Sequence, residues 1–421
     1  MEILLETKME TGLSPEEIRQ AVQTALAGHE YQNVLLIPPD YTRYHSNAGY
    51  IAGCFYQLLS SHANVDVLPA LGTHVPMTEA EFSDMYPAIP FERMLVHRWK
   101  TDVVHIGDVP GSLIEQVTEG LETEPLVCEV NRLILDPKYD LIVSIGQVVP
   151  HEVIGMANYT KNILVGCGGS RTIHRSHMIG ALFGMERMMG KDHTPVREAL
   201  DYGADHFLKD RPILYALTVT TAPKGNTITH GFYIGKDRSV FEAAVRLAQA
   251  KNIDFLDRGI DTCVVYLDSK EFKTTWLGNK AIYRTRMAIK AGGKLIILAP
   301  GVHQFGEDDA IDLLIRKYGY RGRDTILNQF QIQPELKQSM ATAAHLIHGS
   351  SDGRFDVIYA PGHLTREEVE GVGYQYANLS EMLGKYPPET LKTGWNTLSS
   401  GEEIFFIPNP ALGLWIDRHR F

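Results

Sequence analysis

The chain has few cysteines and no arrangement of them that points to a metal or disulfide scaffold. Its 421 residues include only Cys54, Cys128, Cys167 and Cys263, without a C-x-x-C pair. Such spacing is typical neither of a structural zinc site nor of a small disulfide-bonded fold. Near the start, an acid at Glu6 follows only three apolar residues, which is not the pattern of a secretory signal. We therefore expect a cytoplasmic protein.

The chain also lacks long apolar runs and an excess of basic residues. Runs such as Thr262–Leu267 and Lys294–Pro300 are far shorter than the ~18 residues that a membrane helix needs. Asp and Glu number 51 against 40 Lys and Arg, so the formal net charge is -11. Because binding to nucleic acid depends on clustered Lys and Arg, this balance disfavours a nucleic-acid partner. It is compatible with a local basic site for a small anionic substrate.

Length and residue pattern predict an α/β protein of two domains. A chain of 421 residues exceeds one ordinary domain, and its 44% hydrophobic content is enough for sizeable cores. Short β-branched runs alternate with amphipathic stretches, and this alternation restarts near residue 261, which predicts mostly parallel sheets. We expect α/β domains over 1–260 and 261–400 with an active-site cleft between them. Residues 401–421 are expected to form a terminal strand or extension that packs back onto the first domain.

Several elements are predicted in more detail. A capped helix start is expected at Thr78, where an acid stands three residues later. A hairpin is expected around residues 224–226, where a Lys-Gly-Asn turn separates two β-branched runs. Helical spacing of apolar residues predicts helices over 240–251 and 280–290.

Three segments of the first half place polar residues directly after predicted strands. They are Asp40–Arg43, Leu71–Pro76 and the stretch from Val149 to His177. In a parallel α/β sheet, the carboxyl ends of neighbouring strands open onto the same cleft. An Asp, an Arg, a Lys and three His gathered there would form a plausible acid/base and ligand set.

Each of these residues also has an ordinary structural interpretation. Asp40 follows two prolines and could cap a turn, and Arg43 could be a surface cation. Lys161 could be solvated. His74 alone could be a hydrogen-bonded surface residue.

The last of the three segments holds two further features. His174 and His177 are three residues apart, so on a helix they share a face and could chelate a metal. Glycines at positions 166, 168 and 169 permit close approach of the backbone to a phosphate. Without the spacing of a Walker or Rossmann motif, those glycines are weak evidence alone.

The ordered set resembles the nickel-pincer lactate racemases and their homologues. The motifs are Asp40-Tyr-Thr-Arg43, Leu71-Gly-Thr-His74-Val-Pro76, and Pro150-His151 followed by Lys161 after ten residues and His177 after sixteen more. The likeness extends through most of the chain, with Lys280 preceding a Gly-Gly-strand motif in the second half. Order and spacing matched over four motifs are far more specific than any single one.

The resemblance implies a role for each matching residue. Lys161 would carry, covalently, a nicotinic-acid-derived mononucleotide with two sulfur groups, and His177 would bind its nickel. His74 and His151 would be the two acid/base residues. The remaining matches are the substrate-carboxylate residues Arg43 and Lys280, and the cofactor-binding residues Asp40, Thr42 and Trp395. Enzymes that synthesise the cofactor would be the partners of this protein.

The resemblance also implies a reaction, racemisation or epimerisation at C2 of a 2-hydroxy acid by hydride abstraction and return. The α-hydrogen of such an acid is weakly acidic, so removal as hydride is easier than removal as a proton, and the cofactor would store the hydride. A base must take the hydroxyl proton from each enantiomer, which requires two opposed His. An imidazole titrating near ~6.5 suits this task at neutral pH.

Departures from the family pattern bear on the substrate. Tyr44 stands where the family often has Pro, and Glu271–Leu277 lacks the family's Gly-Tyr-Pro-Thr-Asp run. Leu277 falls where a substrate-contacting Gln is expected. These changes leave the cofactor residues intact and favour a 2-hydroxy acid other than lactate, such as a larger acid or a sugar acid.

Two other classes of function remain open from the sequence. A metal-dependent hydrolase or lyase could use His174 and His177 with a carboxylate, although the H-E-x-x-H pattern is absent. A noncatalytic homologue could bind a hydroxy acid or the cofactor without turnover. Retention of both His74 and His151 argues against the second of these.

Overall fold

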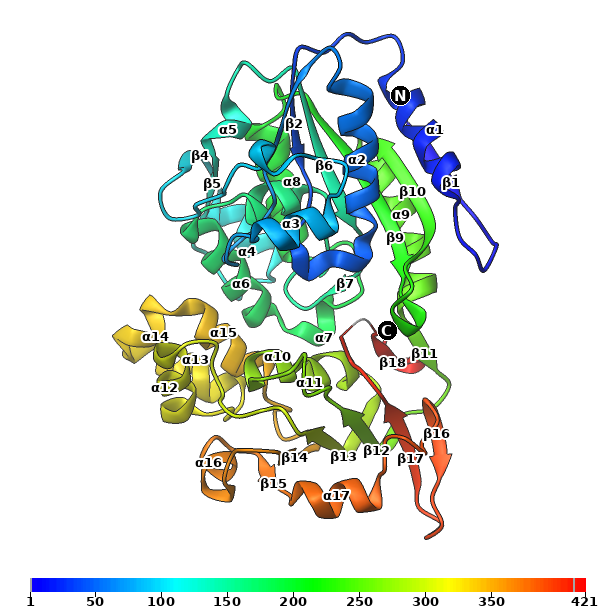
Figure 1. Ribbon diagram of the computed structural model, residues 1–421. Coiled ribbons are helices and arrows are strands. Elements are labelled where there is room, and N and C mark those ends of the chain that lie inside the picture. Colours follow the sequence, from blue (N-terminus) through cyan, green and yellow to red (C-terminus); the bar gives the residue numbers. More distant parts are fainter. Residues whose placement is uncertain (1, 412) are drawn as a thin grey trace. The chain divides into compact units, whose positions relative to one another are not determined.

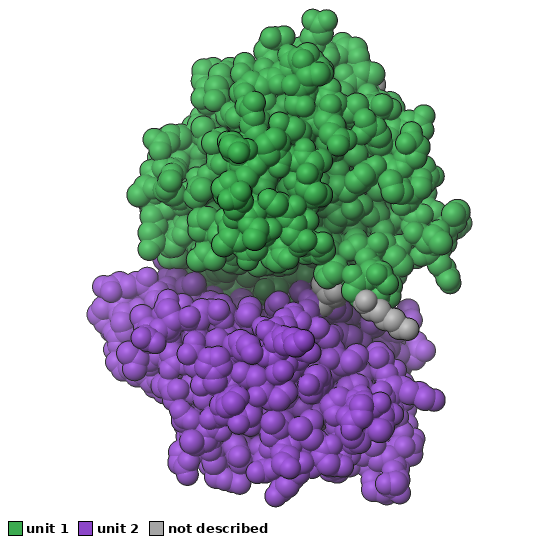
Figure 2. Space-filling model, viewed as in Figure 1, with its two compact units in different colours: residues 1–183, 187–252 green, residues 184–186, 253–421 purple. Residues whose placement is uncertain are grey.

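The chain forms two compact units. The computed structural model describes residues 2–411 and 413–421. Unit 1 comprises Met1–Phe183 and Arg187–Asn252, and unit 2 comprises Gly184–Glu186 and Ile253–Phe421 (Figure 2). Each unit is built around a six-stranded sheet in which most neighbouring strands run parallel. The predicted fold class, two α/β domains with mostly parallel sheets, is confirmed, and the cleft between them stays a prediction.

The sheet of unit 1 places three predicted strands next to one another. Its strands, in spatial order, are β1 (Ile3–Glu6), β10 (Ile228–Gly235), β9 (Ile213–Thr221), β6 (Leu141–Gln147), β2 (Asn33–Ile37) and β3 (Asn64–Val67) (Figure 1). β2 pairs in parallel with both β3 and β6, so the carboxyl ends of these three strands are neighbours. β9 and β10 form the predicted hairpin, with the turn at Pro223–Gly225.

Helices and two small sheets complete unit 1. The helices are α1 (Pro15–Leu26), α2 (Ala48–Leu59), α3 (Glu79–Met85), α4 (Gly111–Val117), α5 (Arg132–Leu135), α6 (Ser170–Phe183), α8 (Pro195–Phe207) and α9 (Arg238–Asn252). The small sheets pair β4 (Val103–Val109) with β5 (Leu126–Asn131), and β7 (Pro150–His151) with β8 (Gly155–Met156). The predicted helix start at Thr78 is a complete capping box, in which Thr78 and Glu81 cap each other's backbone amides. The predicted helix over 240–251 is α9.

Both faces of this sheet are buried, which explains why its strands read as continuous apolar runs. Val34 and Leu36 of β2 point into one core with the apolar side of α2, whereas Leu35 and Ile37 point into the other core with α9. All four side chains are fully buried. Polar side chains can therefore reach solvent only beyond the strand ends.

Unit 2 contains the second parallel sheet. Its strands, in spatial order, are β15 (Gln375–Tyr376), β14 (Asp356–Pro361), β13 (Ile289–Ala299), β12 (Ile260–Tyr266), β17 (Glu403–Ile407) and β16 (Gly394–Thr397), with only β16 antiparallel. A separate parallel pair joins β11 (Asp254–Leu256) to β18 (Trp415–Asp417). The helices are α10 (Thr275–Gly278), α11 (Lys280–Thr285), α12 (Asp309–Tyr318), α13 (Arg323–Ile332), α14 (Pro334–Gln338), α15 (Met340–His348), α16 (Arg366–Gly371) and α17 (Leu379–Lys385).

The division into units differs from the expected boundaries at the carboxyl end. The boundary falls after Asn252 rather than after residue 260, because β11 pairs with β18 and both belong to unit 2. The expected extension 401–421 is an integral part of unit 2, since β17 lies inside its sheet between β12 and β16. The expectation that these residues pack back onto the first domain stays a prediction.

A short segment after α6 also belongs to unit 2. α7 (Met185–Met188) begins within the segment 184–186, and Glu186 forms ion pairs with Arg286, Arg354 and Arg420. Sequence pattern gave no indication of this, because the four residues are far apart in the chain.

The helix expected over 280–290 is shorter than predicted. α11 ends at Thr285, and the chain becomes extended from Ile289, the first residue of β13. The apolar residues of 280–290 therefore serve a helix and a buried strand in succession, which a helical pattern cannot distinguish. Among the described residues, no helix is long and apolar enough to cross a membrane.

Candidate functional site

The three polar segments of unit 1 meet at the carboxyl ends of β2, β3 and β6. Pro39 and Ala70 form a parallel bridge beyond the ends of β2 and β3. The amide of Gly72 donates to the carbonyl of Gly166 at 2.8 Å, which ties the second segment to the third. Asn162 Nδ2 donates to the carbonyl of Ile37 at 3.1 Å and so ties the third segment to β2. The structure thus shows direct contacts between segments for which the sequence gave only the order along the chain.

Asp40 and His74 form a carboxylate–imidazole pair in which the carboxylate is buried. His74 Nδ1 donates to Asp40 Oδ2 at 2.5 Å, and the other carboxylate oxygen accepts from the amide and hydroxyl of Thr42 at 3.1 and 2.5 Å. Burial of the carboxyl opposes its ionisation, but the His74 and Thr42 hydrogen bonds and the Arg43 charge hold the pKa of Asp40 below its usual value. Because a carboxylate can only accept, the proton of a neutral His74 is on Nδ1. Its Nε2 lone pair is therefore available as a base.

His74 itself is presented to solvent by a tight turn. Gly72 adopts a φ of 57°, and the amide of His74 donates to the carbonyl of Leu71 at 3.0 Å. The His74 side chain is 50% exposed, whereas that of Asp40 is 6% exposed. The pair thus combines a fixed, buried carboxylate with an accessible imidazole.

His151 has the opposite hydrogen-bonding pattern. It lies on β7, and its Nδ1 accepts from the amide of Val153 at 3.1 Å. A neutral His151 therefore carries its proton on Nε2. Burial keeps the pKa of His151 well below its usual value; the Glu152 charge opposes this, and the charges of Lys161 and Arg43 add to it. His151 is consequently neutral at pH 7 and offers an N–H to a ligand.

Lys161 is an amine with a strongly lowered pKa. Burial, reinforced by the charge of Arg43, lowers the pKa of Lys161 to about 8, although Glu152 opposes the change. A lysine of this kind has a substantial neutral fraction near physiological pH and can act as a nucleophile. The solvated surface lysine that would be the ordinary interpretation is not what the structure contains.

The backbone around Lys161 is unusual. Asn158 and Tyr159 have φ values of 69° and 58°, a left-handed conformation that is rare for a bulky aromatic residue. The following residues, Asn162–Gly166, form a π-helical turn. Strained residues and π-turns of this kind concentrate at functional sites.

His177 projects from α6 with one ring nitrogen already used. Its Nδ1 donates to the carbonyl of Ile173 at 2.6 Å, so the lone pair of the neutral ring is on Nε2. Burial and the charge of Lys161 lower the pKa of His177 to about 4, against the effect of the Ile173 bond. A neutral imidazole with its other nitrogen held by a backbone carbonyl is a common form of metal ligand. His174, one turn earlier, packs its ring 6.0 Å from that of Trp99.

The glycines near α6 have a packing role. A Cβ on Gly169 would overlap the carboxylate of Glu129, and one on Gly166 would lie 2.8 Å from the Cβ of Ala70. Glu129 also accepts from the amide of Arg171 in the first turn of α6, at 3.2 Å. Glu129 and Ala70 thus pack closely against these glycines, and the suggested phosphate approach stays a prediction.

Two residues of this region escaped the sequence analysis. The charge of Glu152 raises the pKa of His151, Lys161 and His177. Its position next to His151 in the sequence could have indicated a role in the site. Arg197 is fully buried on α8, on the same helical face as Leu200 and Ala204. A cation at an apolar position of an amphipathic helix could have indicated that Arg197 is buried.

A separate group of metal-ligand type lies elsewhere in unit 1. The ligand atoms of Asp192, His193 and Glu242 lie within 4.8 Å of one another. Arg238 forms ion pairs with Asp192 at 2.6 Å and with Glu242 at 3.4 Å, so its guanidinium already neutralises this group. The group does not include His177.

The two predicted site residues of unit 2 have defined local surroundings. Lys280 begins α11 directly after Asn279, which is fully buried and donates to the hydroxyl of Tyr374 at 3.0 Å. Trp395, on β16, packs 5.2 Å from the ring of Phe405 and 4.0 Å from the guanidinium of Arg258. A joint role of these residues with those of unit 1 stays a prediction.

The divergent segment before Lys280 is anchored by its aromatic residues. Phe272 is buried, and the ring of Trp276 stacks on that of His345 at 4.2 Å. Leu277 is half-buried in α10, three residues before Lys280. The segment therefore has a packing role besides any contact with substrate.

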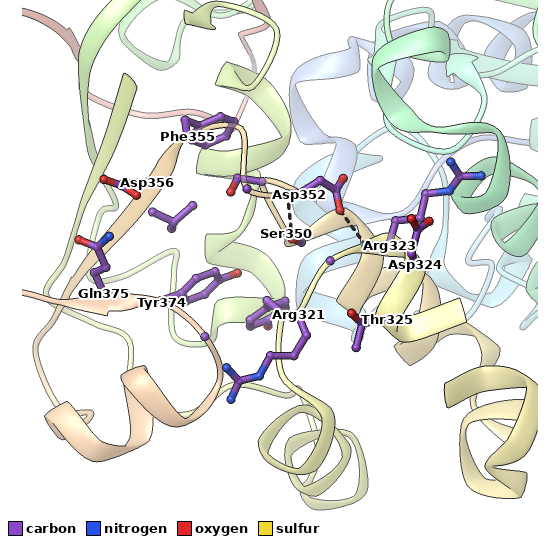
Figure 3. Close-up of a pocket in the computed structure, with 16 residues that line it drawn as sticks. Arg321, Arg323, Asp324, Thr325, Ser350, Asp352, Phe355, Asp356, Tyr374 and Gln375 are labelled. Carbon is purple, nitrogen blue, oxygen red and sulfur yellow. Dashed lines mark hydrogen bonds between the residues drawn. The ribbon is translucent and has the colours of Figure 1, made fainter. Parts of the chain in front are cut away.

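Unit 2 also contains a cavity of about 670 Å³ at the amino ends of β14 and β15. Residues 320–325, 350–353, 355–357 and 373–375 line it (Figure 3). Asp352 accepts from the amide of Arg323 at 2.7 Å, and the amide of Asp352 donates to Ser350 Oγ (Figure 3). Among the described residues that line this cavity there is no predicted site residue.

Fold and site together define an α/β protein with acid/base and amine groups at the carboxyl edge of a parallel sheet. Residues 14–189 match the family model of the lactate racemase N-terminal domain, a span that includes every candidate residue from Asp40 to His177. This part of the chain is therefore similar to the lactate racemase N-terminal domain. The resemblance predicted from the sequence motifs is confirmed over these residues.

Solved structures have the same fold over nearly the whole chain. A protein from Thermotoga maritima solved by a structural genomics consortium is 22% identical, with a TM-score of 0.81 over 98% of this chain and 99% of that one. The lactate racemase apoprotein from Thermoanaerobacterium thermosaccharolyticum is 17% identical, with a TM-score of 0.70 over 96% of this chain and 93% of that one. No curated protein sequence matches the chain.

Proposed function

We propose that this protein is a racemase or epimerase that inverts C2 of a 2-hydroxy acid, using a nickel-pincer nucleotide attached to Lys161. The observation that carries the proposal is the grouping of the Asp40–His74 pair, His151 and His177 around a lysine whose pKa is lowered to about 8. All of these residues lie within the part of the chain that matches the lactate racemase N-terminal domain. The match to the lactate racemase N-terminal domain supports the reaction class.

The residues present fit the cofactor. The neutral fraction of the Lys161 amine could attack an activated carboxyl-derived group, which would release its leaving group while the amine loses a proton, and the free Nε2 of His177 could bind a metal. Nickel suits an imidazole nitrogen combined with soft sulfur ligands. When bound, the cofactor supplies a reversible acceptor for the C2 hydride.

His74 is suited to take the hydroxyl proton of one enantiomer. Its Nε2 is the free basic atom, and the ionised Asp40 stabilises the imidazolium that forms while fixing the ring through Nδ1. Asp40 need not take up the proton itself. In this proposal Thr42 acts through Asp40, because its amide and hydroxyl hold the carboxylate in place.

His151 is suited to interact with the oxygen of the substrate on the other side. Its Nε2–H donates to a ligand in the neutral state, because the Val153 amide occupies Nδ1. To accept a proton from the other enantiomer, Nε2 must first give up its own, so the ring must change to the Nδ1–H tautomer and the Val153 bond must open during turnover. The two His are therefore chemically unequal in the resting protein.

Arg43 and Lys280 are the proposed carboxylate-binding residues. Arg43 offers a fork of donors and Lys280 a point charge, and together they would orient the acid at its reacting carbon. The apolar Leu277 near Lys280 supports an acid other than lactate, larger than lactate or derived from a sugar. Cofactor-synthesis enzymes are the proposed partners, and the cytoplasm is the proposed location.

Coexpression with cofactor-synthesis enzymes tests the attachment. Intact-mass spectrometry should detect an adduct on the wild-type protein, metal analysis should find about one nickel per chain, and peptide mapping should place the adduct on Lys161. Lys161→Arg, which keeps the charge but lacks the nucleophile, should lose both adduct and metal. His177→Ala should keep the adduct and lose nickel. An unmodified, nickel-free wild-type protein under these conditions contradicts the proposal.

The same holo-protein identifies the substrate. Racemisation or epimerisation of a panel of 2-hydroxy acids and aldonic acids is followed by chiral chromatography. Turnover of at least one acid is expected, and it should be lost in both His74→Ala and His151→Ala. Binding without turnover across the panel would instead indicate the noncatalytic homologue, and loss of metal in His174→Ala but not Lys161→Ala would indicate a hydrolase or lyase.

A further inference from the structure

The guanidinium of Arg197 is bound to the segment that precedes Lys161. Arg197 Nη2 donates to the carbonyls of Met156 at 2.8 Å and Asn158 at 3.0 Å, and Nη1 donates to Thr160 Oγ1 at 2.7 Å. The Arg197 side chain has no solvent exposure. One buried planar fork therefore fixes three acceptors within five residues, immediately before the lysine.

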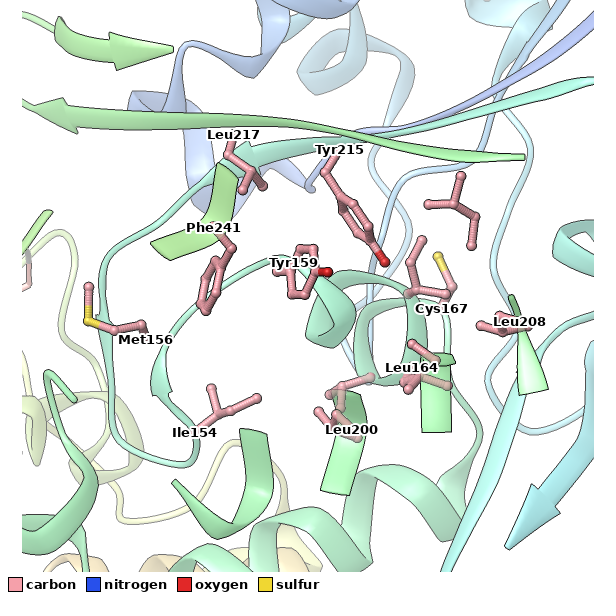
Figure 4. Close-up of a cluster of buried hydrophobic side chains, with 14 of the residues drawn as sticks. Ile154, Met156, Tyr159, Leu164, Cys167, Leu200, Leu208, Tyr215, Leu217 and Phe241 are labelled. Atoms are coloured by element: carbon pink, nitrogen blue, oxygen red, sulfur yellow. The ribbon is translucent and has the colours of Figure 1, made fainter. Parts of the chain in front are cut away.

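This segment needs such support because of its backbone conformation. Asn158 and Tyr159 are both in the left-handed region, which persists for non-glycine residues only where the surroundings enforce it. The ring of Tyr159 lies between those of Tyr215 and Phe241, at 4.3 and 5.1 Å, inside the apolar core (Figure 4). The side chain of Tyr159 is thus held by packing, while its neighbouring carbonyls are held by Arg197.

Arg197 is itself held from both sides. Its guanidinium lies 4.4 Å from the ring centroid of Phe241, and Asp201 is 3.5 Å from Nη1. Asp201 also accepts from the hydroxyl of Thr160 at 2.5 Å and from Arg238 at 2.5 Å. The buried charge is thereby compensated, and Arg197, Asp201 and Thr160 form one closed network.

We propose that Arg197 is a positioning residue. It holds the turn 156–160 and thereby fixes the position of the Lys161 amine, which forms the bond to the cofactor. The inference rests on the proposed function, in which Lys161 carries the cofactor, but the positioning can be measured without any cofactor. Other charged groups that influence Lys161 are Arg43, Glu152 and Asp40. These groups remain unchanged in the variants below.

The test measures the reactivity of Lys161 in the apoprotein. Wild type, Arg197→Lys and Thr160→Val are treated with limiting acetic anhydride over a pH series, and acetylation of Lys161 is quantified by peptide mass spectrometry against the exposed Lys270. Arg211→Lys is the matched control. Arg211 also donates to two backbone carbonyls, those of Ile134 and Asp136, but at a site that does not hold the turn 156–160.

In wild type, Lys161 should titrate near pH 8, in line with its pKa of about 8. Arg197→Lys keeps the positive charge but replaces the two guanidinium nitrogens that reach the three acceptors with a single nitrogen on a shorter fork-less side chain, so not all three bonds should form. The turn should then relax, water should reach the amine, and the midpoint should rise by about one pH unit, which slows acetylation at pH 7 about tenfold. Thr160→Val removes one acceptor and should shift the midpoint in the same direction by less. Arg211→Lys should lower the melting temperature without moving the midpoint.

Unchanged Lys161 midpoints in both Arg197→Lys and Thr160→Val would overturn the proposal, whatever happens to stability. If Arg197→Lys does not fold, Thr160→Val alone decides the matter. Failure of the proposed function has a different signature, because wild-type protein coexpressed with the cofactor-synthesis enzymes would then lack the adduct while the apoprotein titrations still shift.

Discussion

At the scale of single residues, the site depends on how each titratable group is paired. Asp40 lies beneath His74 and fixes which ring nitrogen is free, whereas the Val153 amide fixes the opposite nitrogen of His151. Two histidines with the same predicted role are therefore prepared differently. Their chemistry follows from the hydrogen bond that each ring makes on its buried side.

The carboxylate of Asp40 should be essential to turnover. Asp40→Asn keeps an acceptor for Nδ1 but removes the charge that stabilises the imidazolium, so kcat of the holo-protein should fall at least about a hundredfold with a smaller change in KM. Asp84→Asn is the control, because Asp84 accepts a hydrogen bond from Tyr41 on the surface. Steady-state kinetics on an acid found by the racemisation panel measures both variants. Equal activities of the two variants would contradict the role of Asp40.

Removal of the Glu152 charge should lower the pKa of Lys161, whereas loosening of the turn 156–160 should raise it. The negative charge of Glu152 raises the pKa of Lys161, so Glu152→Gln should lower the titration midpoint below the value of about 8 expected for wild type. More of the amine is then neutral at pH 7, and acetylation of Lys161 at that pH should be faster. The matched change Glu119→Gln, at a surface ion pair with Arg187, should have no effect. A midpoint that rises or stays constant in Glu152→Gln would show that Glu152 does not act on the amine.

At the scale of secondary structure, the sequence predicted the strands that carry the site but not the contacts between their ends. The apolar run 33–37 and the polar residues after it are local signals, and β2 is where they indicated. The hydrogen bond between Asp40 and His74 spans 34 residues and exists only because β2 and β3 are neighbours. The buried fork of Arg197 depends likewise on the docking of α8 against residues 156–160. Local pattern predicts elements, whereas tertiary packing decides which polar atoms meet.

The same limit explains the error in the helix predicted over 280–290. The pattern there is apolar at helical spacing, yet Ile289 enters β13, where it pairs in parallel with Ile260 of β12. A segment distant in the sequence determines the outcome.

Gly146, at the end of β6, shows how tightly the strand end is fitted to the turn before Lys161. Its φ is 152°, and a Cβ there would collide with the side-chain amide of Asn158. Gly146→Ala should therefore destabilise the protein by about 1–3 kcal/mol. Gly120→Ala is the control, because Gly120 also has a positive φ but has nothing within 4 Å of the added carbon. Denaturant unfolding of both variants measures the difference, and equal losses would show that no specific fit exists at Gly146.

At the scale of the whole molecule, the chain passes between its two units three times. The passages fall after Phe183, after Glu186 and after Asn252. The first two flank a segment that directly follows α6, the helix that carries His177. The anchor of this segment in unit 2 is Glu186, whose side chain is 29% exposed and pairs with three arginines.

Glu186 should be important for the stability of unit 2. Burial opposes its ionisation, but the charges of Arg286, Arg354 and Arg420 hold its pKa below the usual value. Glu186→Gln leaves three guanidinium groups without this partner and should reduce the free energy of unfolding by about 1–3 kcal/mol. The matched change Glu403→Gln, at a single exposed pair with Arg258, should cost much less.

The pH dependence of this loss has a definite sign. A carboxyl whose pKa is lowered by folding contributes stability that is fully present above its unfolded pKa of about 4.3 and disappears as the pH falls through the folded value. The difference in unfolding free energy between wild type and Glu186→Gln should therefore be constant near neutrality and shrink on acidification below about pH 4. Urea unfolding at a series of pH values measures it. A difference that grows on acidification, or is absent at pH 7, would mean that the three arginines are stabilised by other groups and that Glu186 is not the anchor of this segment.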